Sequence, residues 1–270
     1  MDLQGHRGAR GYLPENTLPS FAKALDFGVT TLELDVGVTR DGVVVVHHDR
    51  GLNPDIARGP EGNWVPKALP INAMTYAELQ RYDVGRLRPG SDYAKRFPKQ
   101  QPLDGTKIPR LDELFALVQK NRAIRFNIEP KSDLEAPHET LAPEPFARAL
   151  IAELRKAGME RRTTVQAFDW RLLKVVEREA PELATVYCTE GKGSDPARVH
   201  AAGGRIWSPD FEMLTPERLA AARKWGMKVT VWTVNEPADI ARMLAMGVDG
   251  MASDYPDRVL ELLKQRKSAQ

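Results

Sequence analysis

The sequence is short of cysteine, of long apolar runs and of net charge, and each shortage excludes a class of protein. Cys188 is the one cysteine, so neither an internal disulfide nor a cysteine-based metal cluster can form. No apolar run approaches the roughly 20 residues that span a bilayer. The 39 basic and 37 acidic residues leave a net charge of +2, which gives no general attraction to nucleic acid or to an anionic membrane.

From these shortages we expect a soluble protein without an integral membrane segment and without a nucleic-acid partner. No secretory signal precedes Asp2 in the sequence. The expected compartment is the cytoplasm as the sequence stands, and the periplasm or the exterior if a signal segment has been trimmed.

The order of strand and helix patterns predicts an α/β barrel. Strands are expected at the N-terminus and over residues 31–39, and six more alternate with helical segments from Ile108 onward, over residues 124–129, 163–167, 184–188, 205–207, 228–233 and 249–252. Strands that alternate with helices indicate a parallel sheet, and eight of them indicate one (β/α)8 barrel over residues 1–270. An open doubly wound sheet is the alternative, but Gly5-x-x-Gly8 lacks the GxGxxG form that it would need.

Charged side chains stand inside strand sequence between Thr31 and Asp49. Asp41-Gly42 between two β-branched runs is a strong signal for a hairpin with a two-residue turn. That turn would place Asp35 opposite His48, and Glu33 would lie on the same face because strand side chains repeat every second residue. By the same alternation, His47 would point away from Asp35.

The Glu33 and Asp35 carboxylates would repel each other at this spacing. A solvated strand face is one interpretation, but Leu32 and Leu34 flank the pair, and a cation resolves the conflict better than water does. Oxygen ligands suit a hard divalent ion, so we expect one Mg2+ or Ca2+ ion.

Further polar residues follow other predicted strands, at the ends where barrel active sites lie. His6 and Arg7 stand between Gly5 and Gly8, and Glu15 is expected to orient Arg7. Glu129 and Lys131 form a buried ion pair in one interpretation. In the interpretation that we favour, Glu129 is the third carboxylate of the metal site, and Lys131 offers its positive charge to an anionic ligand. Phosphoryl chemistry suits this set of groups at the mouth of the barrel: carboxylates, two histidines, an arginine and a lysine.

Residues 50–106 differ from the rest in composition. They contain seven prolines, little hydrophobic periodicity and one plausible short helix over residues 75–82. A stretch of this kind in a compact domain indicates either an insertion with a functional role or a small subdomain of its own. We interpret it as a cap over the site, walled by Trp64, Tyr82, Tyr93 and Phe97, while a peripheral decoration or a homodimer contact remains the alternative.

Seven short motifs together resemble the glycerophosphodiester phosphodiesterase family. They are HRG at His6–Gly8, PENT at Pro14–Thr17, ELD at Glu33–Asp35, HD at His48–Asp49, E-x-K at Glu129–Lys131, WTVN at Trp232–Asn235 and D-x-P at Asp254–Pro256. The motifs span nearly the whole chain and each follows a predicted strand. Their order along the chain makes the resemblance far more specific than any one tripeptide.

The resemblance implies a TIM barrel that hydrolyses glycerophosphodiesters to sn-glycerol 3-phosphate and an alcohol such as choline or ethanolamine. It implies roles for these residues: Glu33, Asp35 and Glu129 as metal ligands, His6 and His48 as general acid and base, Arg7 and Lys131 as phosphate contacts, Trp232 as a substrate contact, and Glu15, Asn16 and Gln166 as supports behind them. Pro130 and Ala167 depart from the family pattern. A lyase or phospholipase D-like enzyme for lysophospholipid or sphingolipid head groups is the first alternative, and a non-catalytic phosphate-binding barrel is the second.

Overall fold

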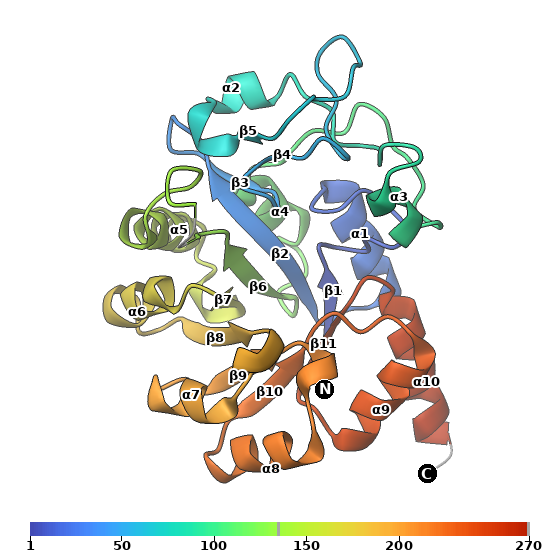
Figure 1. The fold of residues 1–270 in the computed structure, drawn as a ribbon, viewed down its shortest axis with the longest axis vertical. Coiled ribbons are helices and arrows are strands. Elements are labelled where there is room, and N and C mark those ends of the chain that lie inside the picture. The colour runs from blue at the N-terminus through green and yellow to red at the C-terminus, as the bar shows by residue number, and fades with distance from the viewer. Residues whose placement is uncertain (134–135, 269–270) are drawn as a thin grey trace.

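Eight parallel strands close into a barrel in the computed structural model, which describes residues 1–133 and 136–268 (Figure 1). The barrel strands are β1 (Asp2–His6), β2 (Thr31–Val38), β6 (Arg125–Pro130), β7 (Thr163–Ala167), β8 (Ala184–Thr189), β9 (Ile206–Pro209), β10 (Lys228–Val231) and β11 (Gly250–Ser253). The first strand, β1, pairs with both β2 and β11, which closes the sheet. The predicted barrel is therefore confirmed, and the alternative of an open sheet is wrong.

Helices ring the strands, and local signals explain where they begin and end (Figure 1). The barrel helices are α1 (Leu18–Phe27), α4 (Leu111–Leu117), α5 (Pro143–Ala157), α6 (Trp170–Glu179), α7 (Pro196–Ala201), α8 (Pro216–Lys224), α9 (Pro237–Met246) and α10 (Pro256–Ser268). The Thr17 side chain caps α1 by accepting a hydrogen bond from the Ser20 amide, and Gly28 ends the helix at a φ of 86°. No described helix is long and apolar enough to cross a membrane.

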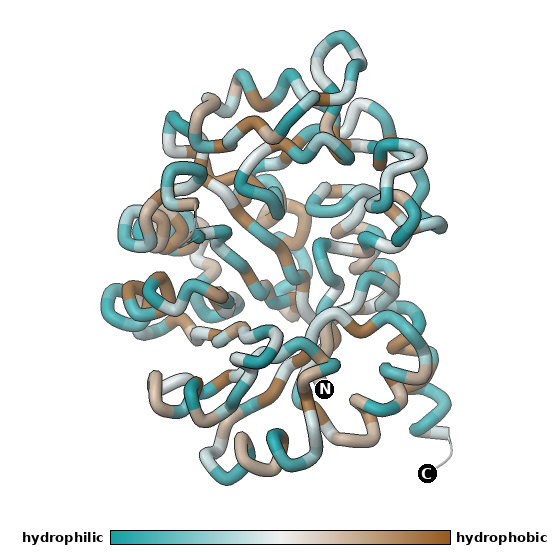
Figure 2. The backbone as a smooth tube through the Cα atoms, in the orientation of Figure 1, coloured by the Kyte–Doolittle hydropathy of each residue, from teal (hydrophilic) through white to brown (hydrophobic). Residues whose placement is uncertain are grey.

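The strand β2 shows how the barrel separates its apolar layer from its polar interior. Leu32, Leu34 and Val36 are fully buried and belong to the main hydrophobic core, which lies between strands and helices. In Figure 2 brown, hydrophobic segments of this strand alternate with paler and hydrophilic ones. Glu33 and Asp35 alternate with those residues and are equally buried, so they must face the barrel interior.

The hairpin after β2 has a different register from the predicted one. In the pairing of β2 with β3 (Val44–Val46), Val36 lies opposite Val46. The Thr39 amide donates to the Val43 carbonyl oxygen beyond the strand ends, which leaves a loop of three residues, the last of which is Gly42 at a φ of 83°. The backbone carbonyl oxygen of Asp35 therefore accepts a hydrogen bond from the His47 amide at 3.0 Å, and the predicted pairing of Asp35 with His48 is wrong. A three-residue loop with glycine in the left-handed region is a common alternative to the two-residue turn.

The insertion is a folded unit, which corrects the prediction of one short helix. It contains β4 (Gly51–Leu52) paired with β5 (Leu69–Pro70), the 3-10 turn η1 (Ile71–Ala73), α2 (Tyr76–Leu79) and α3 (Asp92–Arg96). Its own hydrophobic cluster includes Leu52, Val65, Leu79 and Ile108. These apolar residues have no regular spacing, so periodicity could not reveal them. The insertion lies at the top of the molecule in Figure 1.

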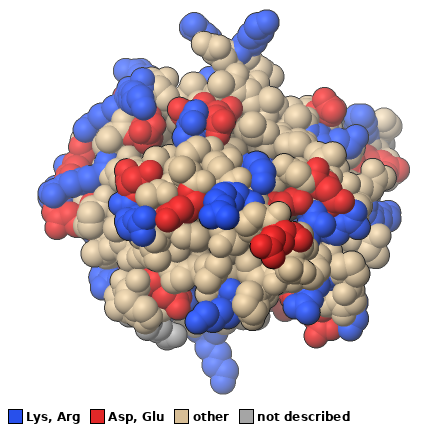
Figure 3. All heavy atoms as spheres, turned by 90° about the horizontal axis from the view of Figure 1, so that it is seen from above, with Lys and Arg blue, Asp and Glu red and all other residues tan. Residues whose placement is uncertain are grey.

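Charges of both signs are mixed on the surface seen from the side of the insertion (Figure 3). No large area of one sign covers that face. This distribution agrees with the nearly balanced net charge of the chain.

Gly8 at the end of β1 offers a test of how tightly the barrel packs there. Its φ is 87°, and an added Cβ would lie 2.7 Å from the Ser20 carbonyl carbon and 2.9 Å from the Phe21 amide. We expect Gly8→Ala to lower the free energy of unfolding by about 2 to 5 kcal/mol, from the left-handed φ plus the backbone clash. Gly42→Ala is the control, because Gly42 has a similar φ and nothing within 4 Å of an added Cβ. Urea unfolding that gives equal losses for both variants would contradict this expectation.

Candidate active site

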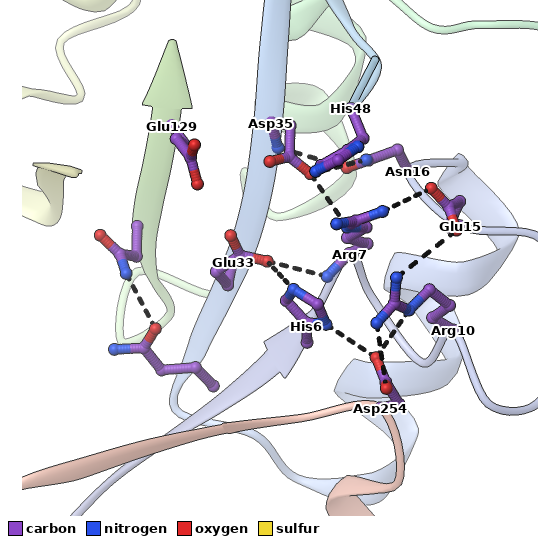
Figure 4. A network of polar contacts seen from close by, with 12 residues as sticks. His6, Arg7, Arg10, Glu15, Asn16, Glu33, Asp35, His48, Glu129 and Asp254 are labelled. Atoms are coloured by element: carbon purple, nitrogen blue, oxygen red, sulfur yellow. Dashed lines mark hydrogen bonds and ion pairs between the residues drawn. The ribbon is translucent and has the colours of Figure 1, made fainter. Parts of the chain in front are cut away.

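A cavity of about 380 Å³ opens at the carboxyl ends of the barrel strands. Its walls carry almost every candidate residue from the sequence: His6, Arg7, Glu33, Asp35, His48, Glu129, Lys131, Gln166 and Trp232. Figure 4 shows how side chains from the ends of β1, β2 and β6 converge there. Asn16 and Glu15 stand behind the wall and contact Asp35 and Arg7.

Three buried carboxylates form the floor of a candidate metal centre. Glu33 and Asp35 come from β2, and Glu129 comes from β6, where it pairs in register with Asp35. One oxygen of each lies within 4.8 Å of the others. Glu33 accepts hydrogen bonds from Gln166 Nε2 at 2.7 Å and from the Arg7 amide at 2.9 Å, which orient it.

The charges of these carboxylates are only partly balanced by the protein. Burial and the neighbouring charge of Asp35 raise the pKa of Glu33 well above its ordinary value. Burial also acts to raise the pKa of Asp35, but the electrostatic effect of the neighbouring His48, Arg7 and Lys131 outweighs it and holds that pKa low. A divalent cation would relieve the repulsion, and an all-oxygen ligand set fits Mg2+ or Ca2+. The residues therefore fit a metal site.

Arg7 and Asn16 reach this centre from strained backbone positions. Their φ angles are 51° and 55°, in the left-handed region that non-glycine residues seldom occupy. Arg7 Nη1 donates to Glu15 Oε1 at 2.8 Å, and Arg7 Nε lies 3.3 Å from Asp35 Oδ2. Asn16 Nδ2 donates to the same Asp35 oxygen at 3.0 Å. Strain of this kind is typical of functional sites, where it aims side chains at a ligand.

His6 is held by Asp254, a residue of the D-x-P motif whose pairing with His6 the sequence did not predict. Its Nδ1 lies 2.7 Å from Asp254 Oδ1, and Arg10 and Asn235 also donate to the Asp254 carboxylate. An ionised carboxylate only accepts hydrogen bonds, so the proton of neutral His6 lies on Nδ1, and Nε2 is free to face Glu33, whose Oε2 is 3.9 Å away. Burial, with help from the Arg10 charge, lowers the pKa of His6 from 6.5 to about 4.

His48 has a similar arrangement on the other side of the cavity. Its Nδ1 lies 2.6 Å from Asp49 Oδ1, and its Nε2 lies 3.2 Å from Lys131 Nζ. Lys131 also donates to Glu129 Oε1 at 2.6 Å, so the ion pair that we weighed as an alternative exists within the site. Glu129 and Asp35 raise the pKa of Lys131 in spite of its burial, which keeps it cationic.

His47 is buried outside the cavity, with Nε2 3.3 Å from the Gly51 carbonyl oxygen. Its predicted orientation is correct, but the predicted reason is wrong. Strand pairing ends at Val46, and the bend that follows, not alternation along the strand, brings His48 into the cavity.

Aromatic residues line part of the mouth. Trp232 donates from Nε1 to the Ser208 carbonyl oxygen and packs edge-on against Phe168, with ring centroids 5.4 Å apart. Of the aromatic residues expected from the insertion, Tyr93 lines the cavity, whereas Trp64, Tyr82 and Phe97 do not. The expectation that four aromatic side chains wall the pocket is therefore wrong.

Known proteins with the same sequence features and fold identify the family. The model of the glycerophosphoryl diester phosphodiesterase family matches residues 6–258. A glycerophosphodiester phosphodiesterase of Caldanaerobacter subterraneus subsp. tengcongensis is 29% identical over 262 residues, which cover 96% of each chain. The solved structure of a glycerophosphoryl diester phosphodiesterase homologue from Silicibacter pomeroyi DSS-3 is 41% identical, with a TM-score of 0.93 over 98% of this chain and 94% of that one.

A phosphodiesterase of Oleispira antarctica, solved in complex with its product sn-glycerol-3-phosphate, shares the fold at 21% identity, with a TM-score of 0.78 over 98% of this chain and 97% of that one. The expectation of a phosphoric diester hydrolase is thus confirmed at the level of the family. The chain belongs to the glycerophosphoryl diester phosphodiesterase family.

Proposed function

We propose that the chain hydrolyses glycerophosphodiesters to sn-glycerol 3-phosphate and an alcohol at this cavity. The observation that carries the proposal is the position of the two histidines. His6 Nε2 lies 3.9 Å from Glu33 Oε2, His48 Nε2 lies 3.2 Å from Lys131 Nζ, and each ring is held at Nδ1 by an aspartate. Two proton-transfer groups on opposite sides of one charged cavity are what cleavage of a phosphodiester requires.

The other residues have roles in binding. Arg7 and Lys131 would contact the phosphate oxygens, and Trp232 would pack against the substrate at the mouth. A divalent cation held by Glu33, Asp35 and Glu129 would supply charge neutralisation for the phosphate oxygens. Glu15, Asn16 and Gln166 would orient Arg7, Asp35 and Glu33, with which they form hydrogen bonds.

In the proposed mechanism, one histidine removes a proton from the nucleophile and the other protonates the leaving alcohol. The nucleophile is either water or the glycerol hydroxyl next to the phosphate. The second route gives a transient cyclic phosphate, which water then opens to sn-glycerol 3-phosphate. Both routes use the same residues.

The rim of the cavity favours a water-soluble substrate over a lysophospholipid. Among the described residues, the large hydrophobic side chains with substantial exposure are Met1, Leu103, Leu117, Phe168 and Trp225. Of these, only Phe168 lines the cavity, and it is 39% exposed. An acyl chain would therefore find little apolar surface next to the phosphate site.

Metal removal tests the proposed reaction. We expect purified protein to release sn-glycerol 3-phosphate from glycerophosphocholine, to lose this activity in EDTA, and to regain it when Mg2+ or Ca2+ is restored. The product is measured with a coupled glycerol 3-phosphate assay. Release that continues unchanged in EDTA would contradict the metal-dependent mechanism. No release from any glycerophosphodiester would contradict the proposed substrate.

The homodimer remains a prediction. Sedimentation of the purified chain at two concentrations tests it.

A further inference from the structure

The insertion reaches the cavity through α3, and Tyr93 makes the closest contacts. Tyr93 and Arg96 line the cavity wall. Next to them, Phe97 packs under the guanidinium of Arg10, 4.6 Å from ring centroid to Cζ. Gln100 Nε2 donates to the Arg10 carbonyl oxygen at 2.8 Å. This part of the insertion is thus docked on the loop that follows β1, the loop that carries Arg7.

The Tyr93 hydroxyl uses its full hydrogen-bonding capacity within one charged cluster. It donates to Glu15 Oε2 and accepts from Arg7 Nη1 at 3.4 Å and from Arg10 Nη1 at 3.3 Å. A phenol offers one proton and two lone pairs, and here all three are occupied. Burial and the charge of Glu15 raise the pKa of Tyr93, so the proton stays in place.

The hydroxyl proton of Tyr93 matters because the carboxylates of Glu15 and Asp35 both attract the Arg7 guanidinium. Glu15 accepts from Nη1, and Asp35 lies beside Nε, a buried nitrogen that has no hydrogen-bond partner among the described residues. Without the Tyr93 hydroxyl, Glu15 Oε2 would lose its hydrogen-bond donor and would keep Arg10 Nη1 as a cationic neighbour at 3.8 Å. Glu15 would then turn toward one of the two arginines to regain a partner, because a buried, unpaired carboxylate oxygen is costly.

We propose that Tyr93 is a positioning residue of the active site: its hydroxyl satisfies Glu15 and thereby keeps the Arg7 guanidinium aimed into the cavity. This inference rests on the proposed function, since it takes Arg7 to bind the phosphate of the substrate. It gives the insertion a part in substrate binding, because substrate affinity depends on the docking of α3 against the β1 loop.

Tyr93→Phe tests the inference, since it removes the hydroxyl and keeps the ring. We expect KM for glycerophosphocholine and the Kd of sn-glycerol 3-phosphate, measured by calorimetry in Mg2+ buffer, both to rise about 10-fold. We expect kcat to change less than about 3-fold, because Arg7 binds the phosphate in the ground state and the transition state alike.

Tyr76→Phe is the matched control. The Tyr76 hydroxyl donates to Glu113 Oε2 at 3.3 Å and so also joins the insertion to the barrel, but outside the cavity. This variant should keep the wild-type KM and Kd. In a Glu15→Gln background, Tyr93→Phe should raise Kd much less than 10-fold, because the charge that the hydroxyl satisfies is gone.

The outcomes separate this inference from the proposed function. Unchanged KM and Kd in Tyr93→Phe, or equal losses in the two tyrosine variants, would overturn the positioning role while leaving the reaction in place. The wild-type chain could bind sn-glycerol 3-phosphate without turnover of any glycerophosphodiester, which would overturn the reaction. Weaker binding of sn-glycerol 3-phosphate by the Tyr93→Phe variant would still support the positioning role in that case. A wild-type chain that neither binds nor turns over would overturn both.

Discussion

His6→Ala is expected to lower kcat for glycerophosphodiester hydrolysis by about 10² to 10⁴-fold, the range that a general acid or base contributes. The ring lies in the cavity, and its Nδ1 is tied to Asp254 at 2.7 Å, so Nε2 is the atom that can exchange a proton with the substrate. KM should change little, because Arg7 and Lys131 remain to bind the phosphate. The measurement is steady-state kinetics with saturating metal.

His200→Ala is the control for this variant, because His200 is exposed and stacks on Trp225 outside the cavity. It should retain full activity. A His6→Ala protein that keeps more than a tenth of wild-type turnover would remove His6 from the mechanism.

Asp35→Asn is expected to weaken metal binding by more than about 100-fold and to lower turnover by about 10²- to 10³-fold. Asp35 is the central carboxylate of the cluster, with Arg7 Nε at 3.3 Å and Lys131 Nζ at 3.7 Å. The amide has nearly the same shape but no charge. Removal of the charge leaves Arg7 paired with Glu15 alone and Lys131 paired with Glu129 alone, and it replaces an anionic ligand by a neutral one.

Calorimetric titration of Mg2+ or Ca2+ into the metal-free protein measures the first effect, and kinetics across metal concentrations measures the second. Asp26→Asn, at an exposed position in α1, is the control with the same chemical change. Metal affinity that is equal in Asp35→Asn and wild type would show that the three carboxylates do not hold the ion.

The sequence by itself determined the barrel and most of the site. Thr17 and Gly28 at the ends of α1 act through their own backbone and immediate neighbours, so the positions of such elements can be inferred locally. Once strands alternate with helices, parallel pairing brings every carboxyl end to one mouth. Glu33, Asp35 and Glu129 could therefore be placed together although nearly a hundred residues separate them.

The tertiary structure decided which side chains support the candidate catalytic groups. Asp254 is 248 positions from His6 in the chain, and Tyr93 reaches Glu15 from an insertion with irregular apolar spacing. Neither pairing has a local signature, since each depends on how distant segments dock. The hairpin register belongs to the same class, because Asp41-Gly42 permits loops of two or three residues and the packing of β3 selects one. Local chemistry thus determined where the elements are, and long-range packing determined which side chains meet.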